Sequence, residues 1–297
     1  MYSHWLLLAE GFLPLALLQC GASTQCSTYL QTSVAQMRQA TGSGCFELDH
    51  VVVAARTPSS RTPRVYVQDQ SGGPYSAIRA KCDASPTHAC PEQTARRVEQ
   101  LLDGAEVTIR GYYLQGSLSG FEEIYLDDVQ DAQTFAAVPA PEKVSLLDIS
   151  RDARARPHWF QVVEAEISPQ DPLVMYDFSP SEFAHAAACP SWSGFALIPA
   201  SLAPVEAAGA CSGGRNPIGL AQPDGRELLI GREFYKEFFA STDCGCAAAS
   251  KQHLLNASST VVGAVFGVLT PEIKTGSSSI YQVFHPLSKT DFPIVGG

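Results

Sequence analysis

The chain has 297 residues, of which 45% are hydrophobic and 17% are charged, a composition that excludes an intrinsically disordered protein and leaves room for two domains. Its 20 Lys and Arg are outnumbered by 30 Asp and Glu, which makes the formal net charge −10. Because binding to nucleic-acid phosphates needs clustered basic side chains, this charge disfavours a nucleic-acid partner without excluding a local basic patch.

The first element in chain order is an export signal over residues 1–19. An apolar run covers residues 11–18, and Cys20 follows it closely, with three small residues after the cysteine. This pattern resembles the signal of bacterial lipoproteins, which implies cleavage before Cys20 and lipidation of its side chain. The protein would then be exported and anchored through its lipid at the bacterial cell envelope or surface, in the outer membrane or periplasm. The alternatives are a plain secretory signal and a helix buried in the core.

The use of cysteine supports export. Apart from Cys20 the nine cysteines leave eight, four in each half of the chain, and an even set in an exported protein predicts disulfides. In the first half we expect the local pairs 26–45 and 82–90. In the second half, 189 and 211 pair either with each other or one each with 244 and 246. The disulfide candidates are Cys26, Cys45, Cys82, Cys90, Cys189, Cys211, Cys244 and Cys246.

No metal site is predicted from these cysteines. Cys82, His88 and Cys90 lie close together in the sequence, but no second pair of Cys or His residues stands at the spacing of a zinc site.

A tether and a first domain follow the signal. Residues 20–44 are small and polar, and they predict a tether that contains a short helix. Residues 45–132 alternate apolar and polar side chains in several runs, which is typical of strands. One helix is expected from Pro91 to about Gly104, where apolar residues recur at helical spacing. The predicted order is therefore three strands, a helix and two more strands.

Two segments of this domain carry a resemblance to a known family. The segment 65–78, "VYVQDQSGGPYSAI", reads as a strand that ends in Asp-x-Ser-Gly-Gly, and the segment 101–128, "LLDGAEVTIRGYYLQGSLSGFEEIYLDD", supplies two later strands. Together they resemble the extracellular OB-fold (oligonucleotide/oligosaccharide-binding) modules of bacterial secreted proteins. The resemblance covers residues 45–129. It implies a small Greek-key barrel of five strands, with the helix between the third and the fourth.

The second half reads as a linker and a second barrel. Residues 133–157 are rich in Pro, Ala and charge, and they predict a linker. Residues 158–297 contain further predicted strands, and the ending "IYQVFHPLSKTD" resembles the ending of the same module class. We expect a second OB-like barrel with a disulfide-rich insertion over 189–246. The predicted fold class is therefore mainly all-β, with two OB-fold-like five-stranded Greek-key barrels and short helices.

The segment with Asp69, Gly72 and Gly73 predicts a turn and not a catalytic or phosphate-binding loop. A phosphate loop needs a Lys after the glycines and a helix after the loop, and here a strand follows. Asp can cap the backbone of a turn, and Gly supplies positive φ without strain. The chain has no Gly-x-Ser-x-Gly, the motif that carries the serine nucleophile of many hydrolases. In each of the carboxylate pairs 122–123 and 127–128, the two side chains are expected to point to opposite faces of the strand, so neither pair converges on one site. We therefore predict a protein that is not an enzyme and has no cofactor.

Aromatic side chains are the better candidates for binding. The face of an OB-fold formed by its second and third strands stacks bases or sugars. If the valines at 65 and 67 point into the barrel, their neighbours at 66 and 68 point out onto this face. The ligand-binding candidates are Tyr66, Gln68, Tyr75, Tyr112 and Tyr125.

The predicted function is a binding or scaffold protein anchored at the cell envelope. The acidic charge favours a carbohydrate or a protein as partner. One alternative is a nucleic-acid-associated OB protein that is accessory to an extracellular nuclease. A second alternative is a hydrolase whose site lies on the second barrel.

Overall fold

A computed structural model gives the architecture of most of the chain. The residues described are 26–57, 62–82, 89–115, 122–149, 152–176, 195–202, 228–231, 234, 260–273, 280–291 and 294–295. Cys20 and the four cysteines of the second half lie outside these ranges, so their predicted lipidation and pairing stay predictions.

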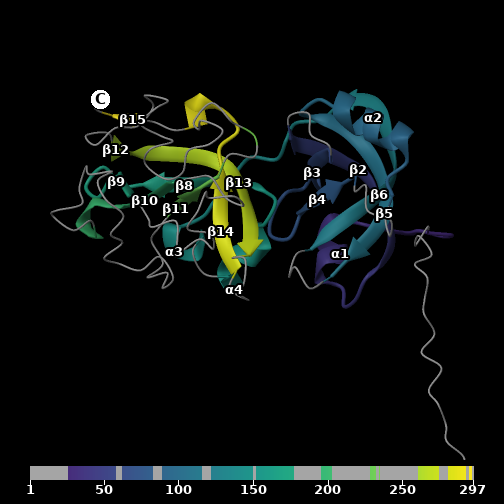
Figure 1. Ribbon diagram of the computed structural model, residues 1–297, viewed down its shortest axis with the longest axis horizontal. Coiled ribbons are helices and arrows are strands. Elements are labelled where there is room, and N and C mark those ends of the chain that lie inside the picture. Colours follow the sequence, from purple (N-terminus) through teal and green to yellow (C-terminus); the bar gives the residue numbers. More distant parts are fainter. Residues whose placement is uncertain are drawn as a thin grey trace, which may run out of the picture.

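The first half forms a six-stranded sheet with two helices (Figure 1). In chain order its elements are β1 (Leu30–Thr32), α1 (Val34–Gln39), β2 (Gly44–Arg56), β3 (Arg64–Gln68), β4 (Ala77–Lys81), α2 (Glu92–Gln100), β5 (Ala105–Leu114) and β6 (Glu123–Phe135).

Five of these strands close into a barrel. The strand order is β1-β2-β3-β4-β6-β5, and an additional pairing of β2 with β5 joins the two ends. Within the barrel β4 and β6 run parallel, whereas the other neighbours run antiparallel. With α2 between the third and fourth barrel strands, this is the Greek-key order of the OB-fold. The fold class predicted from the sequence, mainly β with an OB barrel, is confirmed.

Strand β5 shows how the sequence pattern forms this barrel. Burial alternates strictly along it: Ala105, Val107, Ile109, Gly111 and Tyr113 are buried, and the residues that alternate with them are half-exposed. The β5–β6 register shifts between Arg110 and Gly111, which marks a bulge. At Gly111 a Cβ atom would lie 2.1 Å from the carbonyl oxygen of Tyr125, so the close approach of the two strands requires glycine here.

The described part of the predicted tether packs onto the barrel. Strand β1 runs parallel to the start of β2, and α1 buries Val34 and Met37 in the core. Ser33 begins α1 as a capping box: its hydroxyl accepts the Gln36 backbone N–H, and the Gln36 side chain accepts the N–H of Ser33. Residues 26–44 are thus part of the first domain, because α1 has an apolar side that the small polar composition concealed.

Both disulfides predicted for the first half are present. Cys26 bonds to Cys45 at the start of β2, and Cys82 bonds to Cys90 across the connection from β4 to α2. The first bond ties the N-terminal segment to the barrel.

The second half forms a mixed sheet of nine strands in the order β15-β12-β9-β10-β11-β14-β13-β8-β7. These elements are β7 (Glu142–Lys143), α3 (Leu146–Ile149), α4 (Asp152–Ala155), η1 (Arg156–His158), β8 (Val162–Ile167), β9 (Leu173–Tyr176), β10 (Phe195–Pro199), η3 (Ala200–Leu202), β11 (Leu228–Ile230), β12 (Thr260–Val261), β13 (Gly263–Ile273), β14 (Ile280–His285), η4 (Lys289–Asp291) and β15 (Ile294–Val295).

The nine-stranded sheet also curls into a ring. Strands β12 and β13 are separated by one residue, Val262; β12 pairs with β9, while β13 pairs with β14. The remaining pairs, β9–β10, β10–β11 and β11–β14, complete the circuit. The second barrel therefore has the five strands expected: β8 with β9, β10, β11, β14, and β12 with β13 form the circuit, and β11 runs parallel to β14 as β4 runs parallel to β6 in the first barrel.

The predicted linker, residues 133–157, is divided between the two barrels. Strand β6 continues to Phe135, and β7 pairs in parallel with β8 of the second sheet. Ile149 and Ala155 are buried. One cluster of buried apolar residues runs through both halves, so the segment is packed structure and not a free connection.

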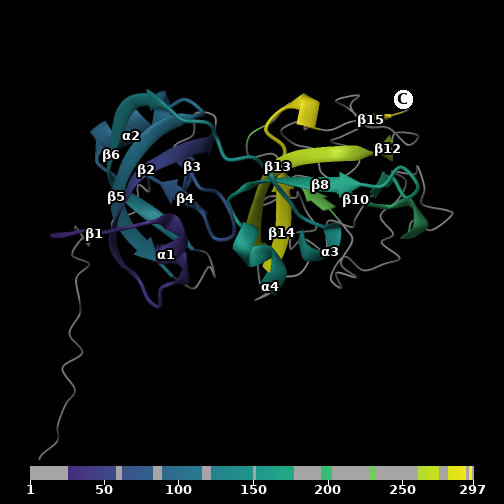
Figure 2. The same ribbon diagram turned by 180° about the vertical axis from the view of Figure 1, so that it is seen from behind.

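Figures 1 and 2 show the two barrels side by side along the long axis. Strands β3 and β4 lie on the side of the first barrel that faces β13 and β14, and β5 lies on its far side. Within the described residues, no helix is long and apolar enough to cross a membrane.

Candidate functional site

The predicted binding face on β3 and β4 is covered by the second half of the protein. Val65 and Val67 point into the barrel as expected, but Tyr66, which points outward, is also fully buried. The centroid of the Tyr66 ring lies 6.3 Å from that of Phe160 and 5.1 Å from that of Phe234. The prediction that Tyr66 is exposed for binding is therefore wrong, because aromatic residues of the second half occupy the space where a base or sugar would stack.

Gln68 lies in the same junction and is only 4% exposed. Its side-chain amide donates to the Ser76 hydroxyl at 3.1 Å. The Gln161 amide donates to the same hydroxyl at 3.0 Å and also to the carbonyl of Gly73. Gln68 thus joins the two halves through Ser76 and is not available to a ligand, which corrects its predicted role.

Tyr75 marks the edge of the junction. It follows the glycine turn with a φ of +64°, and its backbone N–H donates to the carbonyl of Pro157 at 2.6 Å. The guanidinium carbon of Arg38 lies 5.2 Å from the centroid of its half-exposed ring. Tyr75 therefore holds the connection between the barrels and does not lie on an open binding face.

A buried ion cluster fastens the same junction. Arg38 of α1 donates from Nε to the Glu122 carboxylate at 2.8 Å, and both side chains are almost fully buried. Arg156 of η1 donates from Nε to the other oxygen of Glu122 at 2.8 Å. The remaining Arg38 nitrogens donate to three carbonyls, those of Ala77, Trp159 and Arg156. One carboxylate thus binds two guanidinium groups from segments far apart in the sequence, an arrangement that satisfies buried charge.

Glu122 and Glu123 have separate partners, as expected from their opposite strand faces. Glu123 forms ion pairs with Arg79 and with Lys81, the latter at 2.7 Å. Burial alone would raise the pKa of Glu123, but attraction to these two cations outweighs burial and lowers its pKa below the ordinary value. Both carboxylates are therefore engaged in structural ion pairs.

The outer side of β5 and β6 keeps its tyrosines accessible. Tyr112 and Tyr125 are direct cross-strand partners, and both are half-exposed. The Lys81 ammonium lies 4.5 Å from the centroid of the Tyr125 ring. Nearby, the Tyr29 hydroxyl donates to Asp127 at 3.1 Å. We call the surface formed by Tyr29, Tyr112 and Tyr125 the tyrosine face.

Charged groups surround the tyrosine face. Because of the bulge in this hairpin, Asp127 and its neighbour Asp128 are both half-exposed, against the expectation that they point to opposite faces. Asp128 pairs with Arg97 at 2.8 Å. Burial, together with the negative charge of Asp127, which disfavours the phenolate, raises the pKa of Tyr29 to about 12, so its hydroxyl stays protonated and can donate.

The glycine turn has the role predicted for it, with one addition. Gly72 and Gly73 both have positive φ, and the backbone N–H of Gly72 donates to the carbonyl of Asp69. The Asp69 carboxylate, however, accepts the backbone N–H groups of Val34 and Ala35, at 2.9 and 3.0 Å. Asp69 therefore caps the first turn of α1 and not the backbone of its own turn.

The residues that the sequence did not indicate are Arg38, Arg156 and Phe160. Arg38 lies in the stretch interpreted as a tether, and Arg156 lies in the stretch interpreted as a linker. Within the described ranges, no group of three or more His, Cys, Asp or Glu side chains is arranged to hold a metal ion.

Comparisons with known proteins give the chain no family. Its sequence matches no family model and no curated protein. Among solved structures it is similar to an asparaginyl-tRNA synthetase from Pyrococcus horikoshii, with a TM-score of 0.26 and 15% identity over 34% of this chain and 22% of that one. It is also similar to a Leishmania major Friedlin protein described as an aspartyl-tRNA synthetase, with a TM-score of 0.29 and 12% identity over 44% and 25%.

The chain thus spans about a quarter or less of the length of these structures. Similarity this low carries no argument about function. The OB assignment of the first barrel rests on its own strand order and pairing.

Proposed function

We propose that the protein is a non-catalytic binding or scaffold protein, with the first OB barrel as a fixed structural part and the tyrosine face as the surface that meets its partner. The observation that carries the proposal is the burial of the β3–β4 face: Tyr66 is fully buried, whereas Tyr112 and Tyr125 remain half-exposed. Ligand binding by the usual OB face would require the two halves to separate.

The chemistry of the tyrosine face supports a carbohydrate or a protein as partner. Tyr rings provide a large amphipathic contact area with little loss of side-chain entropy, and they stack on sugars as well as on protein side chains. Asp127 and Asp128 flank the rings together with Lys81 and Arg110, so the face itself is mixed in charge. It is the net charge of −10 on the whole chain that disfavours a polyanion.

The location we propose is the bacterial cell envelope, with the chain held there by lipid on Cys20. The disulfides Cys26–Cys45 and Cys82–Cys90 support an oxidising compartment, where such bonds persist. The test is phase partitioning in detergent of the wild type and of Cys20→Ala. We expect the wild type to enter the detergent phase and the variant to stay in the aqueous phase. Equal partitioning of the two would reject the lipid anchor.

The binding proposal is tested with a double variant, Tyr112→Ala with Tyr125→Ala. Wild type and variant are applied to a glycan array and used to capture proteins from an envelope extract. We expect a saturable partner whose binding falls at least about tenfold in the variant, since aromatic anchors dominate such interfaces. The control is Phe135→Ala, because Phe135 is an exposed aromatic residue of β6 away from the tyrosine face, 67% accessible.

Two outcomes would contradict this function. Binding that is unchanged in the double variant would remove the tyrosine face from it. Binding of single-stranded DNA that disappears at moderate salt would favour the nucleic-acid alternative.

A further inference from the structure

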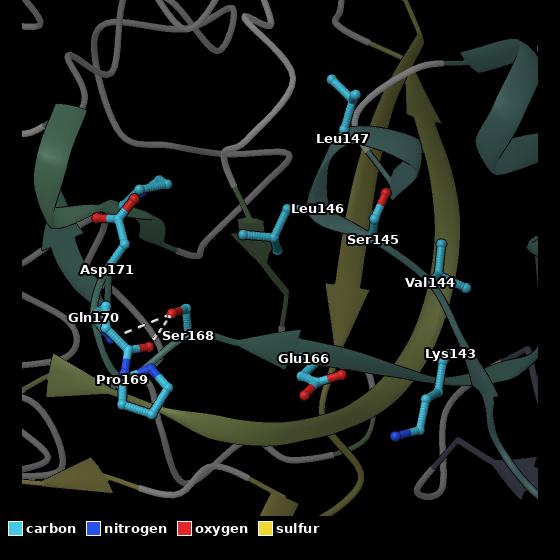
Figure 3. A pocket seen from close by; sticks show the side chains of 11 residues that line it. Lys143, Val144, Ser145, Leu146, Leu147, Glu166, Ser168, Pro169, Gln170 and Asp171 are labelled. Carbon is cyan, nitrogen blue, oxygen red and sulfur yellow. Dashed lines mark hydrogen bonds between the residues drawn. The ribbon is translucent and has the colours of Figure 1, made fainter.

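An open cavity of about 700 Å³ lies in the second half, away from the tyrosine face (Figure 3). Its walls are the connection from β7 to α3, the end of β8 with the turn into β9, and the end of β10 at Pro199. The volume falls in the range in which protein pockets bind ligands of drug size.

One wall of the cavity is aliphatic. It is formed by Val144, Leu146 and Leu147 of the connection from β7 to α3, of which Val144 is buried and the two leucines are half-buried. Pro199, which is also buried, lies beside the turn into β9, where it pairs with Leu173. Figure 3 shows Leu146 projecting from the α3 side toward the opposite wall. Leu146 also packs against the main core, which holds its backbone in place. This wall can bury one aliphatic side chain of a ligand.

The opposite wall is polar and is held by its own hydrogen bonds. The Asp171 carboxylate accepts the backbone N–H and the hydroxyl of Ser201, both at 2.8 Å. The backbone N–H of Gln170 donates to the Ser168 hydroxyl at 3.2 Å. The turn between β8 and β9 is thus preformed, so a ligand would lose little free energy in ordering it.

The charges at the cavity favour a cation. Glu166 and Asp171 contribute carboxylates to the lining, and the cation that lines it, Lys143, already pairs with Glu164 at 3.3 Å. The Glu166 side chain is exposed and forms no ion pair or hydrogen bond with other residues that the structure describes. A ligand with a positive group would therefore find an uncompensated carboxylate beside an aliphatic wall.

We propose that this cavity binds a short extended peptide segment in which an aliphatic side chain neighbours a Lys or Arg. The aliphatic side chain lies against Leu146 and Pro199, and the basic side chain pairs with Glu166. A peptide fits better than a compact small molecule because the rim of the cavity, formed by Glu166, Ser168 and Lys143, is exposed. The peptide chain can therefore continue beyond the cavity. This site goes beyond the proposed function, since it lies on the other half and uses other residues.

The test measures fluorescence anisotropy of a labelled pentapeptide, Gly-Leu-Lys-Leu-Gly, titrated with the full chain. We expect saturable binding that weakens about threefold to fivefold in Glu166→Gln, the size of an exposed ion pair. The matched control is Glu92→Gln, which removes the same charge from an exposed carboxylate in α2, paired with Arg96. The control should bind as the wild type does.

A second set of measurements changes the peptide and not the protein, so its result does not depend on whether a protein variant folds. Replacing the peptide Lys by Glu should weaken binding to the wild type by about tenfold or more, because it exchanges an attraction for a repulsion of similar size, and replacing the peptide leucines by Gly should also weaken binding. The protein variant Leu146→Ala is first checked for folding by its melting temperature. Replacing the peptide leucines by Gly should then weaken peptide binding less in this variant than in the wild type.

Three results would overturn the proposal: no saturable binding, equal weakening in Glu92→Gln and Glu166→Gln, or equal binding of butylamine. The double variant Tyr112→Ala with Tyr125→Ala distinguishes the two proposals. It should still bind the pentapeptide even when it no longer binds the partner of the tyrosine face.

Discussion

The two outer faces of the first barrel carry the same residue types and have different environments. Tyr66 on β3 and Tyr112 on β5 both point away from the barrel axis, yet Tyr66 is fully buried and Tyr112 is half-exposed. The difference arises from Phe160 and Phe234, which the second half places against Tyr66. The alternation of a strand therefore determines which way a side chain points, whereas the neighbouring structure determines what it meets.

The covered face contains buried charged residues as well as aromatic ones. Arg38 and Arg79 both approach the face of Phe160, with guanidinium carbons 5.6 and 5.5 Å from the ring centroid. Each arginine is compensated by a carboxylate, Glu122 or Glu123. The junction thus combines apolar packing with satisfied buried charge, and its residues should dominate stability over those of the exposed face.

The largest expected effect is at Arg38. The variant Arg38→Met retains most of the side-chain volume but removes the pair with Glu122 and the donors to three carbonyls. Since breaking one side of a buried pair leaves unsatisfied polar groups, we expect the free energy of unfolding to fall by about 3–5 kcal/mol. The free energy of unfolding of the two proteins is measured by urea denaturation.

The control for Arg38 is Arg154→Met. Arg154 pairs with Asp148 at 2.8 Å, but its side chain is 53% exposed, so the expected loss is about 1 kcal/mol or less. Equal losses in the two variants would mean that the buried cluster contributes nothing beyond a surface ion pair.

The comparison of the two faces is sharpened by truncating one tyrosine on each. Tyr66→Ala removes a ring packed against Phe160 and Phe234 and should lower the unfolding free energy by about 3 kcal/mol. Tyr112→Ala removes a half-exposed ring and should cost about 1 kcal/mol or less. The two melting temperatures give the check. If Tyr112→Ala were the more damaging of the pair, the assignment of buried and exposed faces would be reversed.

Much of the first barrel could be predicted from local patterns. Alternation along β5, the glycines in the turn after β3 and the helical spacing before Gly104 are all local, and each predicts its element without knowledge of the rest. The disulfides Cys26–Cys45 and Cys82–Cys90 also join residues close in sequence, 19 and 8 positions apart.

The site could not be predicted in the same way because its contacts are long-range. Arg38 meets Glu122 across 84 positions and the carbonyl of Trp159 across 121. An isolated Arg in a small polar stretch carries no signal of burial, and the pattern of β3 does not reveal that Phe160 will cover it. The five strands of the second barrel were expected, but its parallel pair β11–β14 joins strands that are distant in sequence, and no local pattern indicates which strands pair.

The cap of α1 is a weaker contact between the N-terminal segment and the barrel. Asp69→Ala removes the carboxylate that accepts the N–H groups of Val34 and Ala35, so the expected loss of unfolding free energy is about 1–2 kcal/mol. Asp69→Asn keeps one side-chain oxygen as acceptor, so its loss of unfolding free energy should be smaller. If both variants were as stable as the wild type, the box formed by Ser33 and Gln36 would suffice to begin the helix. Thermal unfolding followed by circular dichroism distinguishes these outcomes.

The smallest effect is expected on the exposed side, at His50 of β2. Its ring nitrogens lie beside Glu106 and Asp49, and the hydrogen bond to Glu106, followed by attraction to Asp49, raises the pKa of His50 above 6.5. A raised pKa in the folded state stabilises the fold below pH 6.5, and this contribution is lost as the pH rises through the folded pKa.

We therefore expect the stability difference between wild type and His50→Gln to be larger at pH 5.5 than at pH 8. Because His50 is exposed, 0.5 M salt should reduce the difference. In Glu106→Gln, which removes the main partner of the ring, the further change His50→Gln should have little effect at either pH. A difference that is independent of pH and of salt would show that His50 acts through its positive φ of 53° and not through its charge.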